Sequence, residues 1–400
     1  MHKPSDNAIL SINCGSSSLK FCLYEEGNLE VICYGAISRI GEADGRLDIF
    51  DSEHQLLKGR EKNYKNISAA VSELITYMDE NEHVLNLKVV GHRIVQGGPD
   101  HQDPETITDD LLQKLHGLVY LAPNHLPGEI DAVKAFKTKF PDLLQIACFD
   151  TAFHSDMPDH VKYYPLPGEF QTKGLRKYGF HGLSYQYIMQ KLSENDATVN
   201  QSKIIIAHLG NGASMAAVHN GVCVDTTMGL SPIGGLVMAT RSGDLDPGVL
   251  LFLLKEYQLT VDELDKVLSK ESGLKAIAGT GDVAELLVTE KHNPKATLAL
   301  MVFCYQARKF IGALAAAMGG LNRLVFTGGI GANSPQIRER ICNGLEFMGI
   351  EIDKANNNNG LENISARQGK VTVQAMQTNE ELMIARLVSL VLKNTTSNSN

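Results

Sequence analysis

The chain has 400 residues, of which 43% are hydrophobic and 21% are charged, and its formal net charge at pH 7 is -9. This length predicts two domains, and the composition is typical of a globular protein in water. The negative charge disfavours general binding to nucleic acids or acidic membranes. No apolar run is long enough to predict a helix across a bilayer, so we expect neither a nucleic-acid partner nor a membrane partner.

The cysteines and the first residues bear on the cellular compartment. Seven cysteines are scattered along the chain without a CxxC pair, which favours a reducing compartment over a disulfide framework or a structural zinc site. The opening stretch MHKPSDNAIL lacks the apolar core of a signal peptide. Both observations favour a cytoplasmic protein.

The first predicted element is a β-hairpin built around a polar turn. Residues 8–13 and 19–24 are rich in Ile, Leu and Phe, which predicts two strands joined by the turn CGSSS. A second unit of this kind occupies residues 203–226, with an apolar strand, a Gly/Asn/Ser turn, a second strand, an Asn-Gly turn and a third strand. The repeat indicates an internal duplication, with two related domains that each open on such a hairpin.

Helical patterns lie between and after these strands. Apolar residues at three- and four-residue spacing predict a helix from Ser68, with this serine as its N-cap. A long apolar pattern from Thr297 ends in glycines and predicts a buried helix. A final helix is expected over residues 382–394, after Thr378 as cap and an acidic first turn. Strands mixed with helices predict an α/β fold.

Two polar segments are expected to lie outside regular structure. One is the Asn-rich stretch that begins at Asn356, which we expect to be a mobile loop. The other is the C-terminal tail, residues 395–400, which we expect to be disordered because it offers no apolar side chain to a core.

The turn of the first hairpin raises the question of what it binds. It is not a P-loop, because it leads into a strand and Lys20 lies inside that strand. Backbone N–H groups and serine hydroxyls can still hold a phosphate, although a plain polar turn is the commoner structure. Three more glycine-rich turns, at residues 208–214, 276–282 and 327–333, favour the phosphate interpretation. Four such turns indicate a nucleotide held in a cleft between two domains.

Several charged side chains stand where a ligand could meet them. Arg93 lies at the end of an apolar run before a glycine pair, and Arg241 lies in a polar turn. Guanidinium groups bind carboxylates and phosphates bidentately, although in isolation a surface position is the commoner one for either arginine. Asp150 follows an apolar run, a common place for a general base or metal ligand. His125 and His181 are isolated, as structural histidines often are, and no His spacing indicates a transition-metal site.

Taken together, the motifs resemble the acetate kinase family. NCGSSSLK, GHRIVQGG, FDTAFH, YGFHG, HLGNGAS, DTTMGLSP, TRSGDLDP, KESGL, TGGIG and TNEEL occur in the family's order from about residue 9 to residue 385. The resemblance implies an α/β fold of duplicated ribonuclease-H-like (actin-like ATPase) domains around a central nucleotide cleft. It also implies an N-terminal domain, residues 1–152, with the helix 382–394 packing back on it, and a nucleotide-binding domain, residues 153–381.

The resemblance further implies a Mg²⁺-dependent, reversible transfer of a phosphoryl group from ATP to acetate, giving acetyl phosphate and ADP. Mn²⁺ is an alternative metal, and a homodimer is the family's usual assembly. One alternative function is a kinase for propionate or another short-chain acid. An alternative from another class is an actin- or Hsp70-like nucleotide-switched interaction protein, which would have no need of both Arg93 and Arg241.

By the same resemblance, the site residues fall into four groups. The catalytic residues are Asp150, His181 and Arg241, with Asp150 either a base or an orienting group. The substrate-binding residues are Arg93, Val95, Asn124, His125, Phe180 and Pro232. The nucleotide-binding residues are Ser16, Ser18, Lys20, His208, Leu209, Gly210, Asn211, Gly212, Asp282, Val283, Ala284, Gly329, Ile330, Gly331, Ala332 and Asn333. The metal ligands are Asn13 and Glu380.

The chain departs from the family's usual pattern at several of these motifs. Asn124 stands where a leucine usually forms an apolar wall of the acyl pocket, and Ala284 stands where an arginine usually lies near the adenosine. Gly234 replaces a glutamate, and Tyr185 replaces a histidine. An inward Asn124 would weaken acetate binding, whereas an outward one, with Leu126 turned inward in its place, would be harmless. The preferred acid and nucleotide therefore stay open.

Overall fold

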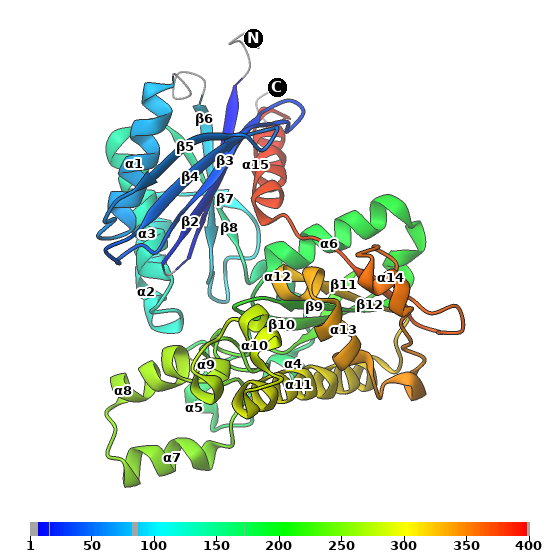
Figure 1. Ribbon diagram of the computed structural model, residues 1–400. Coiled ribbons are helices and arrows are strands. Elements are labelled where there is room, and N and C mark those ends of the chain that lie inside the picture. Colours follow the sequence, from blue (N-terminus) through cyan, green and yellow to red (C-terminus); the bar gives the residue numbers. More distant parts are fainter. Residues whose placement is uncertain (1–6, 16, 82–86, 172, 398–400) are drawn as a thin grey trace. The chain divides into compact units, whose positions relative to one another are not determined.

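The computed structural model describes residues 7–15, 17–81, 87–171 and 173–397. The chain divides into two compact units, of which unit 1 comprises Met1–Ala152 with Asn379–Asn400 and unit 2 comprises Phe153–Thr378. Each unit is built on one β-sheet with helices packed against it (Figure 1). The α/β prediction is therefore confirmed.

The sheet of unit 1 has the strand order β5-β4-β3-β2-β1-β6-β8-β7. Its strands are β1 (Ala8–Cys14), β2 (Leu19–Glu25), β3 (Val31–Ser38), β4 (Arg46–Asp51), β5 (Leu56–Glu61), β6 (Leu87–Ile94), β7 (Glu105–Thr106) and β8 (Leu144–Phe149). Strand β1 pairs antiparallel with β2 and parallel with β6, which pairs parallel with β8. Strand β1 is buried along most of its length, as expected of a central strand covered on both faces.

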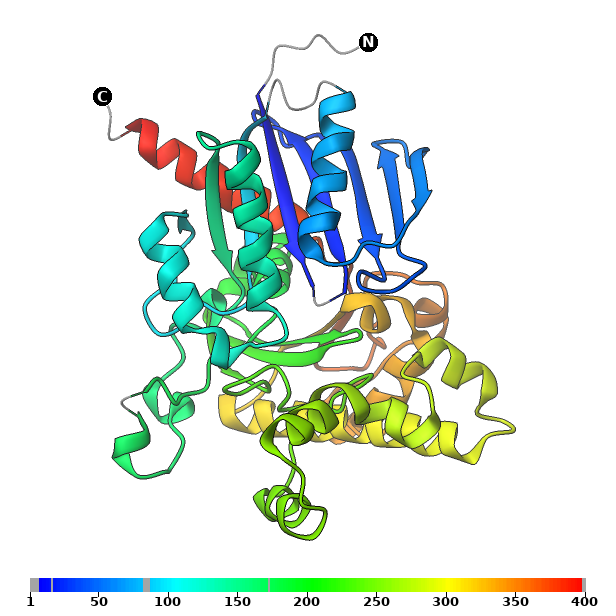
Figure 2. The same ribbon diagram turned by 90° about the vertical axis from the view of Figure 1, so that its left-hand side faces the viewer.

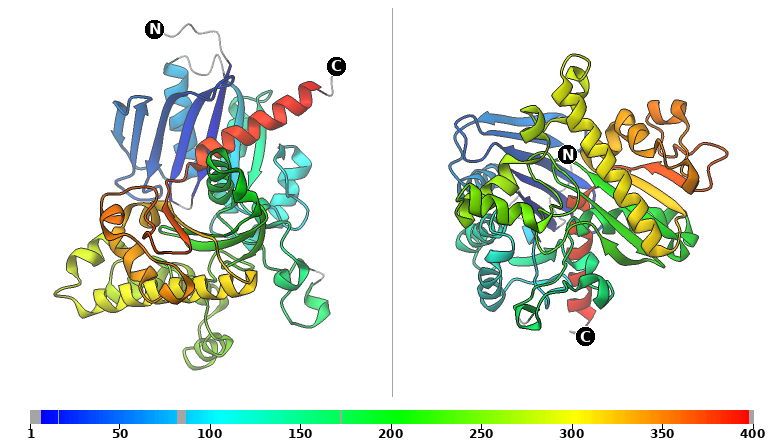
Figure 3. Two further views of the ribbon diagram at one scale, coloured as in Figure 1. Left: turned by 90° about the vertical axis from the view of Figure 1, so that its right-hand side faces the viewer. Right: turned by 90° about the horizontal axis from the view of Figure 1, so that it is seen from below.

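Helices cover both faces of this sheet. They are α1 (Ile67–Glu80), α2 (Asp109–Gly117), α3 (Leu126–Lys139) and α15 (Glu380–Ser397), with the short turn η2 (Val119–Leu121). Helices α1 and α3 lie on one face, and α15 lies on the other, against β1, β2, β6 and β8 (Figures 2 and 3). A Cβ atom on Gly91 of β6 would lie 2.5 Å from Ile384 of α15. Glycine there allows this close helix–strand contact.

The sheet of unit 2 has the order β11-β10-β9-β12-β13. Its strands are β9 (Lys203–Leu209), β10 (Ala213–His219), β11 (Val222–Thr226), β12 (Arg323–Thr327) and β13 (Thr372–Ala375). Strand β9 is antiparallel to β10 and parallel to β12, which is parallel to β13. Strands β3-β2-β1-β6-β8 of unit 1 have the same order and directions. This shared topology confirms the duplication expected from the two hairpins.

The helices of unit 2 include two that sandwich its sheet. Helices α6 and α11 lie on opposite faces (Figures 1 and 3). The full set is α4 (Asp159–Lys162), α5 (Gly168–Gln171), α6 (Gly182–Asn195), α7 (Pro247–Glu256), α8 (Val261–Lys266), α9 (Gly273–Ala278), α10 (Val283–Thr289), α11 (Pro294–Met318), α12 (Gly328–Asn333), α13 (Pro335–Cys342) and α14 (Lys354–Asn358). Shorter turns are η3 (Ala152–His154), η4 (Ala197–Gln201), η5 (Val267–Glu271) and η6 (Glu346–Met348).

Helix α11 corrects the expectation that no apolar run could span a membrane. The helix has 25 residues, and an 18-residue window of it has a mean hydropathy of 1.3, so it passes that test by length and composition. The helix also contacts β9, β10 and β11, and buried Ala299, Phe303 and Ala307 form part of its inner side. A core helix of a globular unit has this character, so the apolar run is explained by packing.

Two helix caps differ from the sequence expectation. Helix α1 begins one residue before Ser68, and Asn66 is its cap, with a side-chain oxygen that accepts from the N–H of Ala69 at 2.9 Å. In α15 the corresponding acceptor is Asn379 rather than Thr378. Both predictions missed an asparagine one or two positions from the hydroxyl residue, and asparagine is at least as good an N-cap.

The two segments expected to be irregular are partly helical. Helix α15 continues to Ser397, since residues 395–397 contain no glycine or proline to stop it; residues 398–400 lie outside the described part of the chain. The Asn-rich stretch forms α14, where Asn357 is buried. Its side-chain oxygen accepts from Nε of the buried Arg338 at 2.8 Å. Because a buried guanidinium group must have hydrogen-bond acceptors, its bond to Asn357 holds this segment in an ordered conformation.

Asn357→Ala tests that explanation of the Asn-rich segment. The variant leaves the buried Arg338 without one of its acceptors, so we expect a loss of about 1–3 kcal/mol of unfolding free energy. Urea unfolding followed by circular dichroism measures it, with Asn358→Ala on the exposed side of α14 as the matched control. Equal unfolding midpoints for the two variants would contradict the explanation.

Candidate active site

The strand ends of unit 1 bring Arg93 and Asp150 together. Arg93 lies near the end of β6, Asp150 directly follows β8, and the two strands are parallel neighbours. Nη2 of Arg93 donates to Oδ2 of Asp150 at 2.7 Å, and Asp150 is fully buried. Burial opposes the charge of Arg93, but Asp150, Glu380 and Glu129 outweigh it and raise its pKa. Arg93 is therefore a nearly buried, permanent cation.

Glu129 is a residue of this cluster that the sequence analysis missed. It lies in the first turn of α3, is fully buried, and its Oε2 accepts from the N–H of Val95 at 2.9 Å. Its Oε1 lies 4.0 Å from Nη1 of Arg93 and has no hydrogen-bond partner among the described residues. Burial raises the pKa of Glu129 to about 8, even though Arg93 acts against that rise. The available signal was an acidic residue among the apolar residues Leu126, Ile130 and Val133 at helical spacing.

The segment before α3 carries the other acyl-pocket candidates of unit 1. Asn124 is half-buried, His125 is the half-buried N-cap residue of α3, and Leu126 is completely buried. Of these three residues, Leu126 alone has a fully buried side chain. Val95 is also buried, with its N–H fixed by Glu129. The candidates Phe180 and Pro232 belong to unit 2.

Oxygen-bearing side chains gather where β1 ends and α15 begins. The amide nitrogen of Asn13 donates to Oε2 of Glu380 at 2.9 Å and to Oε1 of Glu381 at 3.2 Å. Burial, followed by the charge of Glu380, raises the pKa of Glu381, while Lys20 lowers it. Among the described residues, no group of three or more His, Cys, Asp or Glu could hold a metal. The chain offers an amide oxygen and carboxylates, which suit a hard cation that brings other ligands.

The turn between β1 and β2 is closed by its own backbone. The N–H of Gly15 donates to the carbonyl of Ser18 at 2.7 Å, and the carbonyl of Ser17 accepts from Ile40 at 2.9 Å. Ser18 is half-buried and Lys20 is exposed on β2, opposite Asn13 in register. The candidate Ser16 lies outside the described residues.

In unit 2, His181 stands at the start of α6 in an unusual backbone conformation. Its φ of 61° lies in the left-handed region, which is costly for a residue with a side chain and is often found at functional sites. Its Nδ1 lies 2.8 Å from Oγ of Ser214, and its ring stacks on His208 with centroids 4.3 Å apart. Nδ1 of His208 in turn lies 2.8 Å from Oγ of Ser184. The serines, which sequence reasoning missed, orient both rings.

Arg241 and His181 converge on Gly212. A Cβ atom on Gly212 would lie 3.1 Å from Nε2 of His181 and 3.8 Å from Nη1 of Arg241. The same Nη1 donates to the carbonyl of Pro232 at 3.0 Å. Glycine therefore keeps the space beside both cationic or donor groups open, as close approach of a ligand would require.

The glycine-rich turns of unit 2 lie against one another. A Cβ on Gly210 would lie 3.8 Å from the backbone nitrogen of Gly329. The N–H of Ala239 donates to the carbonyl of Asn211 at 3.3 Å, and a Cβ on Gly281 would lie 2.8 Å from the carbonyl oxygen of Ala239. Turns from four distant stretches thus form one group, as the nucleotide hypothesis requires.

The remaining nucleotide candidates differ in what they expose. Asp282 caps α10, with a carboxylate oxygen that accepts from the N–H of Ala284 at 2.8 Å and that of Glu285 at 3.3 Å. This carboxylate is therefore partly occupied by its own helix. Asn333 donates to the carbonyl of Gly329 at 2.9 Å, and Arg338 donates to the carbonyls of Gly331 and Ala332. Leu209 and Val283 are buried in the unit 2 core, whereas Ile330 is half-buried.

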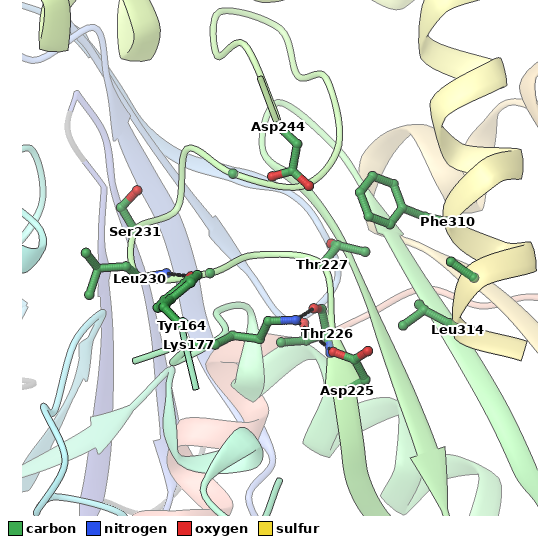
Figure 4. A pocket seen from close by; sticks show the side chains of 13 residues that line it. Tyr164, Lys177, Asp225, Thr226, Thr227, Leu230, Ser231, Asp244, Phe310 and Leu314 are labelled. Carbon is green, nitrogen blue, oxygen red and sulfur yellow. Dashed lines mark hydrogen bonds and ion pairs between the residues drawn. The ribbon is translucent and has the colours of Figure 1, made fainter. Parts of the chain in front are cut away.

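A cavity of about 430 Å³ lies beside the loop that carries Pro232. In Figure 4, Tyr164 and Lys177 stand on one side of it, and Phe310 and Leu314 stand on another. Oη of Tyr164 accepts from the N–H of Leu230 at 2.9 Å, and Lys177 donates to Asp225 at 2.9 Å. The bond from Tyr164 holds this loop at Leu230, two residues before the Pro232 whose carbonyl accepts from Arg241.

Comparisons with known proteins show the family of the chain. The model of the acetokinase family matches residues 8–386. An acetate kinase of Thermoanaerobacterium thermosaccharolyticum is 42% identical over 388 residues, covering 94% of this chain and 97% of that protein. The crystal structure of Porphyromonas gingivalis acetate kinase is 36% identical, with a TM-score of 0.86 over 96% of this chain and 100% of that one. A propionate kinase from Francisella tularensis is 35% identical, with a TM-score of 0.89 over 95% of this chain and 98% of that one. The chain belongs to the acetokinase family.

Proposed function

We propose that this protein transfers the terminal phosphoryl group of ATP reversibly to the carboxylate of acetate, giving acetyl phosphate and ADP. The observation that carries the proposal is the buried Arg93–Asp150 pair at the strand ends of unit 1. In a family of carboxylate kinases, such an arginine binds the acid, since its planar fork matches a carboxylate. The other edge of Arg93 is left for that substrate.

The acid needs no strong base to become a nucleophile. A carboxylate has a reference pKa near 4 and is already ionised at neutral pH. Asp150, whose oxygen accepts from Arg93 at 2.7 Å, therefore acts as an orienting group for the arginine. His181 and Arg241 stabilise charge on the transferring phosphoryl group, because phosphoryl transfer depends on positioning and on donors aimed at its equatorial oxygens.

The glycine-rich turns of unit 2 bind the nucleotide. Their backbone N–H groups and the absence of Cβ atoms suit close contact with phosphates. By the family resemblance, Ser16 and Ser18 after β1 and Lys20 on β2 are proposed contacts of the phosphates. Ala284 stands where the family usually has an arginine, which leaves the contact with adenosine weaker. Other purine nucleotides are therefore candidate phosphoryl donors.

Asn13 and Glu380 fit a Mg²⁺ ion, with Mn²⁺ as the alternative. Their donors are hard oxygens, and Mg²⁺ commonly uses one or two carboxylates with waters and substrate phosphates. The bound cation would neutralise phosphate charge during transfer. Glu381 lies against the same amide and is a further candidate for this site.

Propionate is the second candidate substrate. The likeness to a propionate kinase structure supports it, as does the half-buried Asn124, which leaves the acyl pocket without one usual leucine. A single methylene changes binding by only about 1–3 kcal/mol. We therefore expect both acids to react. The cytoplasm is the proposed compartment of the reaction.

A homodimer is the proposed assembly, and the outer side of α11 supports it. Leu298, Met301 and Tyr305 are 52%, 64% and 62% exposed. Their spacing of three and four residues puts them on one face of the helix. Unpartnered apolar side chains of this kind favour contact with a second copy of the chain.

The proposed reaction is tested by trapping acyl phosphate with hydroxylamine. With ATP and Mg²⁺, we expect acyl hydroxamate from acetate and from propionate, and less from butyrate. Omission of the metal, or its chelation, should abolish the product. If no short-chain acid gives product at high enzyme concentration, the proposed function is wrong.

Arg241→Ala should lower kcat by about 10³-fold, the scale on which arginines stabilise phosphoryl transfer. Arg241→Lys should restore little, because a point charge cannot form the fork. Steady-state kinetics measure both, with the exposed Arg367→Ala as the control. A decrease below about tenfold in a folded Arg241→Ala variant would contradict the assigned role.

The double substitution of Met301→Glu and Tyr305→Glu should dissociate the homodimer, because four carboxylates would then face each other across it. Light scattering during size-exclusion chromatography gives the mass. Phe347→Glu, which replaces an exposed apolar side chain outside α11, serves as the control. A dimer that persists in the double variant would place the interface elsewhere.

A further inference from the structure

Glu129 is a buried acid beside the cation that binds the substrate. Its Oε2 is engaged by the N–H of Val95 at 2.9 Å, whereas Oε1 stands 4.0 Å from Nη1 of Arg93 without a partner among the described residues. Nη2 of the same arginine belongs to Asp150. A carboxylate that paired with Arg93 would be expected to lie about 1 Å closer, as charge-assisted hydrogen bonds do.

The charge balance around Arg93 makes the state of Glu129 important. Asp150 already neutralises the guanidinium, and Glu380 also acts on it. If Glu129 were an anion, a substrate carboxylate would enter a site with several negative charges around one positive charge. Like charges at such distances oppose binding strongly when they are shielded from water.

We propose that Glu129 is a positioning residue of the acid site that works in its neutral form, holding Val95 through Oε2 and leaving the Nη1 edge of Arg93 to the substrate carboxylate. The inference rests on the proposed function of a carboxylate kinase. It makes Glu129 a determinant of acid affinity that acts through Arg93 and Val95 rather than on the reacting atoms.

The environment of Glu129 supports a neutral carboxyl group at neutral pH. Burial raises its pKa to about 8; Arg93 and the Val95 N–H lower it, and Asp150 raises it. The thiol of Cys14 on β1 is neutral because burial raises its pKa. Glu73 on α1 is paired with Arg60 and Lys62, and Asp109 and His116 on α2 contact Lys137 and Lys134 of α3. On α3 itself, Asp131 is exposed and His125 stands at the N-cap.

The proposal gives a definite pH dependence. As the pH rises through about 8, Glu129 ionises and competes with the acid for Arg93. The KM for acetate should then increase by up to about tenfold per pH unit, while kcat changes less.

The stability of the fold depends on pH through the same carboxyl group. In the native protein Glu129 keeps its proton between about pH 4.5 and 8, whereas in the unfolded chain it loses the proton. The wild-type free energy of unfolding therefore falls across that window.

Glu129→Gln and Glu129→Ala separate this role from simple packing. Glutamine keeps an acceptor for the Val95 N–H and cannot ionise, whereas alanine removes both properties. We expect Glu129→Ala to raise the KM for acetate at every pH. Glu129→Gln should have a KM for acetate close to the wild-type value at pH 7, and this KM should not increase above pH 8. Asp131→Asn, on the exposed side of α3, is the matched control and should keep the wild-type profile.

Two readouts make the outcome decisive. If Glu129→Gln keeps the wild-type rise of KM with pH, or binds acetate as poorly as Glu129→Ala at pH 7, the inference is overturned. Urea unfolding without substrate provides the second readout: the stability gain of Glu129→Gln over wild type should grow between pH 5 and pH 8. An absence of that growth also overturns it. If the wild type makes no acyl phosphate, the proposed kinase function is refuted. The role of Glu129 still stands in that case if the stability gain of Glu129→Gln grows with pH and wild-type acetate binding, measured by calorimetry, is lost above pH 8.

Discussion

The ion pair of Arg93 and Asp150 is the constraint on which the site of unit 1 depends. Both groups are nearly or fully withdrawn from water, so neither can stand without the other. Removing one partner of a buried pair typically costs about 3–5 kcal/mol, because an uncompensated charge remains. The parallel register of β6 and β8 supplies the pairing geometry. A shift of either strand would separate the two groups and leave Glu129 beside an unmatched cation.

The duplicated topology explains why chemical groups recur at strand ends in both units. In parallel neighbours the carboxyl ends meet at one edge, where turns can present polar groups to a ligand. In unit 1 that edge carries Asn13, Arg93 and Asp150, which lie at or just beyond the ends of β1, β6 and β8. In unit 2 the corresponding edge carries the glycine turns after β9 and β12. The same topology thus presents polar and charged side chains at the strand ends of unit 1 and glycine-rich turns at the strand ends of unit 2.

Sequence patterns were sufficient where the information is local. The two hairpins, the long helix that Gly319 caps and the position of Asp150 after a strand follow from short-range periodicity and turn residues. They were insufficient where a residue's role depends on partners far along the chain. The sequence pattern predicts a mobile loop at Asn357 because it cannot show the tertiary contact with Arg338. Glu129 escaped notice for the same reason, since its partners lie 34 and 36 positions before it.

The choice of glutamate at position 129 has a physical meaning that a comparison with glutamine makes clear. Either side chain could accept from the N–H of Val95, and glutamine would do so without a carboxyl that destabilises the fold when its proton is lost. The property that glutamate adds is titration, with a pKa raised to about 8. A neutral Glu129 leaves Arg93 to the substrate, and an ionised one competes for it. A glutamate at position 129 therefore makes the binding of acetate depend on pH, in a range where acetate itself is always ionised.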